Sequence, residues 1–382
     1  MKVLYIVHST MCGGATISFL NMILGLKNQG VSPIVVSPDI GENEQFDKTL
    51  KDNNIPHYKI CIVSSYLPIV KFDNIFHWIN RFVTIPIKKR RSMRQLREVI
   101  RKEAPVIIHT NTGVVHEGYK VARNLGLPHV WHLREYQTLD FHWYILPSAS
   151  RFRKMLKQSY VVTISDGIRS YFGLTDSPNA HTIYNGIYKQ NDIRFNYPKS
   201  NYFLCASRIS PVKGHDDVIE AFALFVKDYP NYRLKILGDG KEDYVRHLKK
   251  KTILLGCADK VDFIGMKYDV REWMSNAKSL IVASKFEGFG RMTAESAFCG
   301  TLVIGRNTGG TSEIINKIGG LLFDDISGLR KQMVTLTSLS EEEYSKMVLS
   351  AQKTAADLYS IENNVIQIKM LYESICHRKS IS

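Results

Sequence analysis

The sequence predicts an α/β protein made of two doubly wound, Rossmann-like domains, and two observations support this. Short apolar, β-branched runs alternate with amphipathic segments along most of the 382 residues, a pattern typical of parallel sheets covered by helices on both faces. The alternation breaks once, in the polar, proline-containing segment 188–200, and then restarts. We therefore place an N-terminal domain at residues 1–188 and a C-terminal domain at residues 199–360. A C-terminal helix, at about 361–382, is expected to pack back on the first domain.

The N-terminal domain contains the first set of expected elements. Strands are predicted at residues 3–7, 33–38, 105–110, 128–133, 160–165 and 181–186. Residues 15–26 carry apolar side chains at helical spacing, and the helical segment 116–126 ends at a glycine. Two such sheets in tandem are expected to face each other across a cleft, because ligands of doubly wound sheets bind beyond the carboxyl ends of the strands.

The C-terminal domain repeats the alternation. Strands are predicted at residues 202–207, 232–237, 261–265, 279–284 and 302–305, and helices at 215–229, 242–256, 269–277 and 293–299. The last 45 or so residues contain no strand signal and are expected to be helical.

Composition excludes several classes of protein. The first apolar run, at residues 3–7, is too short for a secretory signal. The sequence has no run of about 18 uncharged apolar residues that could span a bilayer. The six cysteines are scattered without a C-x-x-C pair, so cysteine-bound metal is not expected and a reduced cytoplasmic location is the simplest interpretation.

The net charge of +15 is concentrated in the N-terminal half, since residues 1–200 hold 26 basic and 14 acidic side chains. Within it, the segment from Phe72 to Arg97 places an apolar stripe before a basic cluster. The stripe is Phe72, Ile75, Phe76, Ile79, Phe82 and Val83, and the cluster is Lys88, Lys89, Arg90, Arg91, Arg94 and Arg97. An apolar face beside a basic cluster predicts docking on an anionic membrane. The alternative is a stripe packed on its own domain with a solvated basic face.

Glycines follow the first predicted strand. Gly13 and Gly14 precede the first helix, where the backbone can approach a ligand and free N–H groups can bind an anion. A tight strand-to-helix turn explains the same residues. The pattern is not G-x-G-x-x-G, so dinucleotide binding is disfavoured.

Charged residues follow two strands of the C-terminal domain. Arg208 and Lys213 come after the strand at 202–207, where Arg can hold two phosphate oxygens and Lys adds a point charge. Glu287 lies in the glycine loop after the strand at 279–284, and Glu295 lies in the early turns of the next helix. Carboxylates on either side of a helix N-terminus can accept hydrogen bonds from sugar hydroxyls beside a bound phosphate. Purely structural explanations remain open. Arg208 and Lys213 would then lie on a solvated turn. Glu287 would cap a loop, and Glu295 would stabilise the positive end of its helix.

These motifs together resemble the family-4 retaining glycosyltransferases of the GT-B fold, and among them bacterial cell-surface polysaccharide glycosyltransferases. The similar stretches are GGA, SRISPVKGHDDVIEAF, LGDG, FIG, FEGFGRMTAESAFCGTLVI and TGGTSEII. They span most of the second domain and one loop of the first. The Glu-x7-Glu spacing with its internal GFG is the specific part.

The resemblance implies roles for individual residues. Glu287 contacts the donor sugar, Glu295 binds the nucleotide ribose, and Arg208 and Lys213 hold the diphosphate. Gly13 and Gly14 approach the donor from the first domain, and His132 lies near the transferred sugar. The expected catalytic set is His132, Glu287, Arg208 and Lys213, and the expected donor site is Gly13, Gly14, Arg208, Lys213, Gly265, Glu287, Gly288, Phe289, Gly290 and Glu295. A strand-end histidine satisfied within the protein is the alternative for His132.

The sequence departs from the family pattern at Arg291, where apolar residues are usual, and after Gly300, where proline is frequent. Neither departure removes a predicted contact. The chain contains no Asp-x-Asp pair, so the resemblance implies metal-independent transfer, in which positive side chains and a helix end meet the leaving-group charge. No protein nucleophile, metal site or cofactor is expected, and a UDP- or GDP-sugar is the expected co-substrate.

The leading hypothesis is a cytoplasmic transferase, peripheral on the inner face of the cell membrane, that acts on a glycan or lipid-linked acceptor. A nucleotide-sugar 2-epimerase on the same fold is the first alternative, although the basic, aromatic-rich first domain speaks against it. A non-enzymatic nucleic-acid-binding protein is the second. The basic residues of this chain lie among apolar residues and do not have the spacing of a surface on which bases stack. No nucleic acid is therefore expected as a partner.

Overall fold

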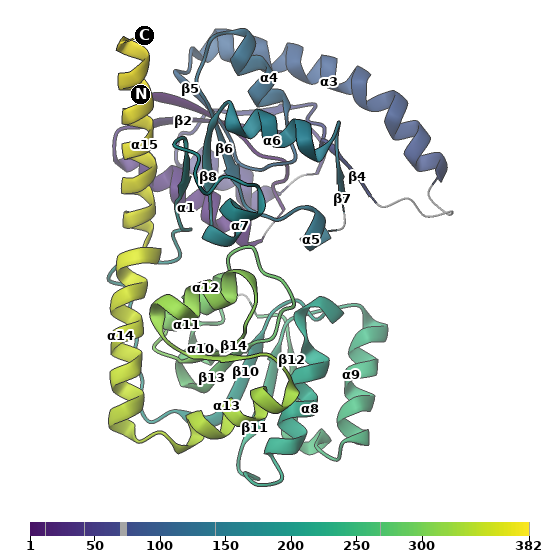
Figure 1. The fold of residues 1–382 in the computed structure, drawn as a ribbon, viewed down its shortest axis with the longest axis vertical. Helices are drawn as coiled ribbons and strands as arrows, with labels where there is room; N and C mark the ends of the chain where they lie inside the picture. Colours follow the sequence, from purple (N-terminus) through teal and green to yellow (C-terminus); the bar gives the residue numbers. More distant parts are fainter. Residues whose placement is uncertain (12, 42, 69–74, 142, 268, 382) are drawn as a thin grey trace. The chain divides into compact units, whose positions relative to one another are not determined.

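The computed structural model describes residues 1–11, 13–41, 43–68, 75–141, 143–267 and 269–381. The chain forms two compact units. Unit 1 contains Met1–Gly186 and Ile361–Ser382, and unit 2 contains Ile187–Ser360. Each unit is built on a sheet of parallel strands covered by helices (Figure 1). The predicted class, two Rossmann-like α/β domains, is confirmed.

Unit 1 is built on a seven-stranded sheet of order β3-β2-β1-β5-β6-β8-β9. Its strands are β1 Lys2–Ile6, β2 Ser32–Pro38, β3 His57–Ile60, β5 Ile107–Thr110, β6 His129–Leu133, β8 Tyr160–Thr163 and β9 Ala180–Thr182. Its helices are α1 Gly14–Asn28, α2 Glu44–Asp52, α3 Ile75–Glu103, α4 Glu117–Asn124, α5 Thr138–Phe141, α6 Ala149–Lys157, α7 Asp166–Tyr171 and α15 Ile361–Ile381. Strands β4 Tyr66–Pro68 and β7 Trp143–Ile145 pair separately and antiparallel. The strand order reverses between β1 and β5, which makes their carboxyl ends the switch point of the sheet.

Strand β1 shows how the sequence pattern divides the core of unit 1. Val3 and Tyr5 pack in one cluster with side chains of α1 and α15, whereas Leu4 and Ile6 pack in another with side chains of α3 and α4. Successive side chains of a strand point to opposite faces, so a continuous apolar strand is covered on both sides. The N-terminal strand therefore holds both helical layers together.

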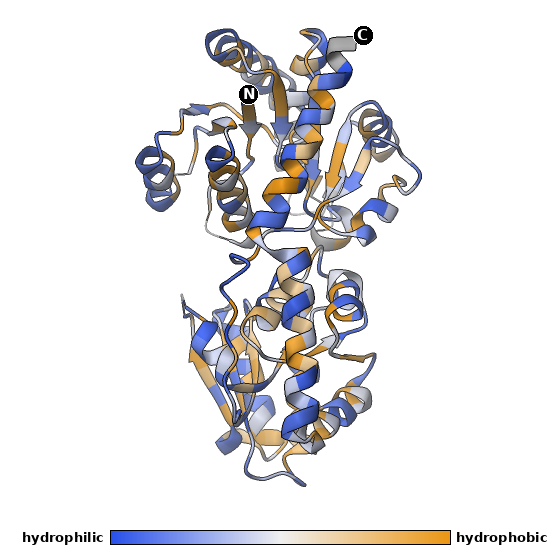
Figure 2. Cartoon of the chain, turned by 90° about the vertical axis from the view of Figure 1, so that its left-hand side faces the viewer, coloured by the Kyte–Doolittle hydropathy of each residue, from blue (hydrophilic) through white to orange (hydrophobic). Residues whose placement is uncertain are grey.

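Helix α15 returns the end of the chain to unit 1 and lies beside α1 (Figure 1). Its buried apolar residues recur every three or four positions, which gives one packed face. They are Val365, Ile368, Leu371, Tyr372 and Ile375. Apolar and hydrophilic turns alternate along this helix (Figure 2), and Ile366 and Met370 remain exposed on it.

Helix α3 carries the basic cluster predicted to bind a membrane. Phe72 and the side chains of Ile75, Phe76, Ile79, Phe82 and Val83 lie outside the described residues. Lys88, Arg90, Arg91 and Arg94 are exposed, whereas Lys89 turns inward. Its Nζ donates to Ser65 Oγ at 2.6 Å and lies 3.9 Å from Glu117 Oε1. Across the described residues, every helix is too short or too polar to cross a bilayer.

Unit 2 is built on a six-stranded parallel sheet of order β12-β11-β10-β13-β14-β15. Its strands are β10 Ser200–Ala206, β11 Arg233–Leu237, β12 Val261–Gly265, β13 Ala277–Val282, β14 Val303–Arg306 and β15 Leu321–Phe323. Its helices are α8 His215–Phe225, α9 Glu242–Leu254, α10 Arg271–Asn276, α11 Arg291–Phe298, α12 Gly309–Ile318, α13 Ile326–Ser338 and α14 Glu341–Tyr359, with 3-10 turns at Pro211–Lys213 and Ala258–Lys260. Here the order reverses between β10 and β13. The helical prediction for the end of the chain is confirmed by α14 and α15.

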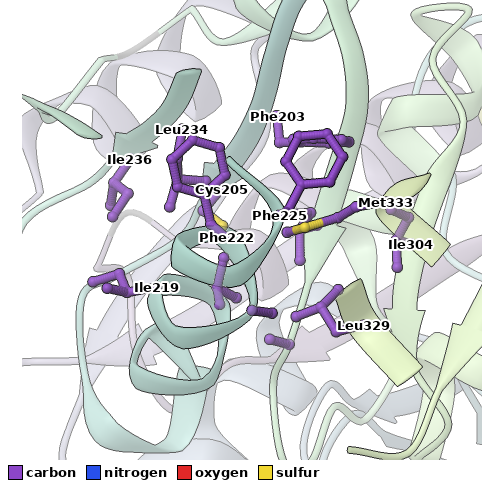
Figure 3. Packing of buried hydrophobic residues seen from close by; sticks show 14 of the residues in the cluster. Phe203, Cys205, Ile219, Phe222, Phe225, Leu234, Ile236, Ile304, Leu329 and Met333 are labelled. Atoms are coloured by element: carbon purple, nitrogen blue, oxygen red, sulfur yellow. The ribbon is translucent and has the colours of Figure 1, made fainter. Parts of the chain in front are cut away.

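The larger core of unit 2 is aromatic and lies between the sheet and helices α8 and α13 (Figure 3). Phe225 is fully buried, and its ring centroid lies 5.2 Å from that of Phe203 and 4.6 Å from that of Tyr229. Edge-to-face and stacked ring pairs add to the stabilisation from burial alone. The next residue back, Leu224, is 46% exposed on the same helix.

We expect Phe225→Ala to destabilise unit 2 by about 3–5 kcal/mol, because it removes a buried ring and leaves a cavity. The matched variant Leu224→Ala should change stability by less than about 0.5 kcal/mol. Hydrogen exchange at the amides of β10 and β11 measures both changes within unit 2. Similar losses of protection in the two variants would contradict this description of the core.

Candidate functional site

The switch point of unit 2 brings two predicted motifs together. Strands β10 and β13 are neighbours in the sheet, and the loop after each leaves at the same edge because the strands are parallel. The loop after β10 contains Arg208 and Lys213, and the loop after β13 contains Glu287. In open α/β sheets ligands bind outside the carboxyl ends of the strands at this reversal. The topology therefore places the predicted bases and the first predicted acid at a ligand-binding edge.

Close backbone contacts hold these two loops against each other. Gly214 has φ +71°, and a Cβ on it would lie 2.2 Å from the carbonyl oxygen of Ala283. Only glycine meets both conditions, since the backbone is left-handed and the space is filled by main chain. The N–H of Lys285 donates to the carbonyl oxygen of Val212 at 2.9 Å. The two loops are thus fixed main chain to main chain.

Lys213 and Glu287 form an ion pair across this junction. Lys213 Nζ donates to Glu287 Oε1 at 2.5 Å, and each side chain is 22% exposed. Arg208 is exposed in the same loop as Lys213, and its side chain makes no hydrogen bond or ion pair with the described part of the chain. The site therefore combines one positioned lysine, one carboxylate and one arginine that is available to a ligand.

Two helix N-termini adjoin the loop of Glu287. Helix α11 begins directly after Gly290, which has φ +84°, and helix α12 begins at Gly309. The N–H of Gly310 donates to the carbonyl oxygen of Glu287 at 2.8 Å, and a Cβ on Gly310 would lie 2.3 Å from the carbonyl oxygen of Phe289. The first turns of helices expose N–H groups that favour anions. The loop from Glu287 to Gly290 is thus held by main-chain contacts, and it lies beside the positive ends of two helices.

Glu295 lies in the second turn of α11 and is 6% exposed. Arg291, the departure from the family pattern, donates from Nε to Glu295 Oε1 at 2.6 Å. The pair fixes the carboxylate and uses one of its oxygens. Gly265 is more distant, since it ends β12, two strands away from β10. Its carbonyl oxygen accepts the N–H of Gly238 at 2.9 Å.

In unit 1, Gly13 and Gly14 are exposed at the N-terminus of α1. Gly13 has φ −178°, an extended conformation that any residue adopts, and a Cβ on it would meet no described atom within 4 Å. Neither the backbone nor the packing of the described chain requires glycine at residue 13.

His132 lies in β6 and is completely buried. Its Nδ1 lies 3.2 Å from His109 Nε2 on the neighbouring strand β5. Burial, together with the charges of Arg134 and His109, holds the pKa of His132 well below its usual value. His132 is therefore neutral at physiological pH.

Polar residues that the sequence reasoning did not assign gather at the same edge of unit 1. Arg134, directly after β6, donates from Nε to Asn111 Oδ1 at 2.8 Å and from Nη1 to Asn185 Oδ1 at 2.7 Å. Thr112 donates to Glu135 Oε1 at 3.0 Å, and burial raises the pKa of Glu135. The stretches HTNT and HLRE, each a strand running directly into polar residues, are the signal that could have identified them.

Within the described residues, histidine, cysteine and acidic side chains do not gather in groups of three or more that could hold a metal ion. The charged groups of the unit 2 site are instead Arg208, Lys213, Glu287 and the Arg291–Glu295 pair.

Comparison with protein families identifies the class. The model described as "Glycosyl transferases group 1" matches residues 189–347, and the model described as "Glycosyltransferase Family 4" matches residues 12–190. The two models together cover nearly the whole chain. The chain thus belongs to the family-4 glycosyltransferases of the GT-B fold, and it is a glycosyltransferase.

Individual relatives agree with this class. An uncharacterised glycosyltransferase of Methanocaldococcus jannaschii is 25% identical over an alignment of 380 positions that covers 95% of each chain. The D-inositol 3-phosphate glycosyltransferase of Jonesia denitrificans is 26% identical over 184 residues, 46% of this chain and 43% of that one. The crystal structure of HepE from Anabaena in complex with UDP matches with a TM-score of 0.79 at 19% identity, and covers 98% of this chain and 100% of HepE. At that identity the structural match shows the fold.

We expect unit 1 to be the acid-labile part of the protein. Burial lowers the pKa of His8 to about 4, lowers those of His116 and His129 to about 3, and holds those of His109 and His132 well below 6.5. The unfolded chain binds these protons near pH 6.5 and the folded unit does not, so stability falls as pH drops below 6.5. Each histidine contributes about 1.4 kcal/mol per pH unit.

Two buried carboxyl groups of unit 1 act in the opposite direction, because burial raises the pKa values of Glu117 and Glu135. The two carboxyl groups therefore offset only part of the acid destabilisation caused by the five histidines. Hydrogen exchange, corrected for intrinsic rates, should show that unit 1 loses protection before unit 2 between pH 7 and pH 5. Equal protection of unit 1 at both pH values would refute the expectation.

Proposed function

We propose that this glycosyltransferase moves a sugar, with retention of anomeric configuration and without a metal ion, from a UDP- or GDP-sugar to a glycan or lipid-linked acceptor. Polysaccharide biosynthesis is the process that such an activity serves. The observation that carries the proposal is the Lys213–Glu287 pair at the switch point of unit 2, with Arg208 in the adjoining loop.

The diphosphate of the donor is assigned to Lys213, Arg208 and the N-terminus of α11. As the bond between sugar and phosphate breaks, the leaving nucleoside diphosphate gains negative charge, and groups already oriented toward that charge lower the barrier. Lys213 is oriented by Glu287 before any ligand arrives. Arg208 can add two donors in the planar geometry that suits phosphate. These groups take the place that a metal held by an Asp-x-Asp pair has in other transferases.

The two acids are assigned to the two sugars of the donor. Glu287, on the glycine loop, accepts hydrogen bonds from hydroxyls of the transferred sugar. Glu295 accepts from the ribose, and its pairing with Arg291 leaves Oε2 for that contact. Gly265, Gly288, Phe289 and Gly290 are assigned main-chain or surface contacts to the donor. The absence of side chains at three of these four positions permits close approach.

In unit 1, Gly13 and Gly14 are assigned main-chain contacts to the donor, and His132 is assigned a contact to the transferred sugar. The surroundings of Gly13 support its role, because a Cβ on residue 13 would meet no atom of the described chain within 4 Å, which leaves the backbone accessible to a ligand.

The chemical step requires no nucleophile from the protein. The acceptor hydroxyl forms its bond to the anomeric carbon on the face from which the diphosphate departs. The proton of that hydroxyl passes to a phosphate oxygen of the leaving group. One carbon–oxygen bond forms and one breaks, and the configuration is retained. The products are the glycosylated acceptor and the nucleoside diphosphate.

Relatives support the choice of donor. HepE has been solved with UDP and with UDP-glucose, and another relative is named N-acetyl-alpha-D-glucosaminyl L-malate synthase, from Bacillus anthracis. These names belong to those proteins. For this chain the HepE complexes favour a UDP-sugar over a GDP-sugar as the donor to test first.

The acceptor is assigned to a membrane surface, with the protein peripheral on the cytoplasmic face. Lys88, Arg90, Arg91 and Arg94 are exposed along α3, and Ile87 beside them is 65% exposed. Each base near an anionic surface contributes about 1 kcal/mol. Docking through the segment Phe72–Arg97 would bring a lipid-linked acceptor to the enzyme.

We expect Lys213→Met and Arg208→Met each to lower kcat by roughly 100-fold or more, because they remove positive charge that stabilises the departing diphosphate. Turnover is measured as nucleotide release from a UDP-sugar with acceptor present, in buffer containing EDTA. The matched variant Arg246→Met removes an exposed charge of α9 and should retain full activity.

Two outcomes would contradict the assignment. Loss of activity in EDTA, restored by magnesium or manganese, would contradict the metal-free mechanism. Full activity of the Lys213 and Arg208 variants would contradict the diphosphate site. Conversion of the donor sugar to its 2-epimer without an acceptor would favour the epimerase alternative.

We expect the protein to float with liposomes that contain anionic lipid and to be released at high salt. Replacing Lys88, Arg90 and Arg91 with glutamate should abolish flotation, because it reverses three exposed charges and leaves the inward-turned Lys89 in place. Glutamate at Arg246, Lys249 and Lys250, three exposed bases of α9 in unit 2, serves as the matched control. Equal flotation of the two triple variants would count against docking through α3.

A further inference from the structure

His132 lies at one end of a line of buried hydrogen bonds that crosses unit 1. The line contains Tyr5 of β1, His109 of β5, His132 of β6 and Tyr372 of α15, and all four side chains are fully buried. Tyr372 OH donates to Tyr5 OH at 3.1 Å and lies 2.7 Å from His109 Nδ1. His109 Nε2 lies 3.2 Å from His132 Nδ1. The C-terminal helix, some 240 residues later in the chain, thus reaches His132 through a single imidazole.

The hydroxyl of Tyr372 determines which nitrogen of each imidazole in this line carries a proton. It has one hydrogen, which it gives to Tyr5, so toward His109 it can only accept. His109 therefore carries its proton on Nδ1. Burial keeps both imidazoles neutral, so His109 Nε2 has a lone pair and accepts the Nδ1 proton of His132. His132 Nε2 is left with a lone pair.

That lone pair has no hydrogen-bond partner in the part of the chain that the structure describes, although the atom is buried. A buried polar atom without a partner costs free energy, and such an atom indicates a missing partner or a functional role. A lone pair on a neutral ring attracts a hydroxyl proton and repels a phosphate oxygen. The partner that fits is therefore a hydroxyl donor, which a sugar supplies and a diphosphate does not.

We propose that Tyr372 is a positioning residue that acts through His109 to hold His132 in the tautomer whose Nε2 accepts a hydrogen bond from a hydroxyl of the transferred sugar. This inference rests on the proposed contact between His132 and that sugar. Helix α15 then has a role beyond covering the sheet, because its phenol group determines which hydrogen-bonding face the histidine presents.

Two conservative variants change the line in different ways. Tyr372→Phe keeps the buried ring and removes the hydroxyl, so His109 Nδ1 loses its acceptor and both tautomers of His132 become populated. Tyr5→Phe removes the acceptor of the Tyr372 proton, which can then turn to His109 Nδ1. The whole line reverses in that case, and His132 Nε2 becomes a donor.

The test is ¹⁵N NMR of histidine-labelled protein, with the His132 signals assigned by their loss in His132→Gln. In the parent protein we expect a protonated Nδ1 and an unprotonated Nε2. Tyr372→Phe should give intermediate shifts, and Tyr5→Phe should exchange the two. The matched control is Tyr119→Phe, which removes the hydroxyl of another buried tyrosine of unit 1, bonded to Gln158 Oε1 at 2.8 Å, and should leave the His132 signals unchanged.

Kinetics complete the test. Tyr372→Phe should lower kcat by about 10- to 100-fold, the size of effect found when the partner that orients a metal-binding histidine is removed. It should leave KM for the donor within about 2-fold, because the nucleotide is held by other residues. Tyr119→Phe should leave both parameters unchanged.

The outcomes separate this inference from the proposed function. An Nε2 proton on His132 in the parent protein, or unchanged tautomers in both tyrosine variants, would overturn the role of Tyr372 even if His132→Gln is inactive. Full turnover of His132→Gln would overturn the contact between His132 and the sugar, and with it the inference.

Discussion

The close packing of backbone at the carboxyl edge of unit 2 is the constraint on which the candidate site depends. Gly214 leaves no room for a Cβ beside Ala283, and Gly310 leaves none beside Phe289. The first contact brings the loops after β10 and β13 together main chain to main chain, so that Lys213 meets Glu287, and the second packs the start of α12 on the loop that contains Glu287. A side chain at Gly214 would push the loops after β10 and β13 apart and separate Lys213 from Glu287, and one at Gly310 would displace the loop of Glu287 from α12. The arrangement of the charged groups in the candidate site thus depends on glycines, which allow the loops to pack main chain to main chain.

The two units provide different polar environments. In unit 2 the functional groups are charged and partly exposed, a state suited to an anionic ligand that arrives with its own hydration. In unit 1 the central histidines are buried and neutral, because burial lowers their pKa values. Neutral imidazoles suit the recognition of hydroxyl groups, whose hydrogen bonds need direction more than charge.

Much of the fold could be predicted from the sequence, because apolar runs bounded by turn residues correspond to buried parallel strands. The missed strands include His57–Ile60, Tyr66–Pro68, Trp143–Ile145 and Leu321–Phe323. All four are short, and the first alternates polar and apolar residues too briefly to form a pattern. The position of Lys213 beside Glu287 could also be predicted from the sequence, since both residues follow strands that flank the switch point. The roles predicted for the site residues remain proposals.

Other features depend on contacts that no single sequence displays. Arg291 was identified as a departure, but its bond to Glu295 depends on side-chain rotamers within α11. Tyr372 and His109 are 263 residues apart, and only the return of α15 to unit 1 brings them together. Their link gives His132 a defined environment that the strand-end position alone did not suggest.

A crystal structure of this protein with a bound nucleoside diphosphate tests the central claim most directly. The account predicts that the diphosphate lies against Lys213, Arg208 and the N-terminus of α11, with the ribose at Glu295. A nucleotide bound at another edge of unit 2, or one that leaves Lys213 and Glu287 without contact to it, would contradict the claim.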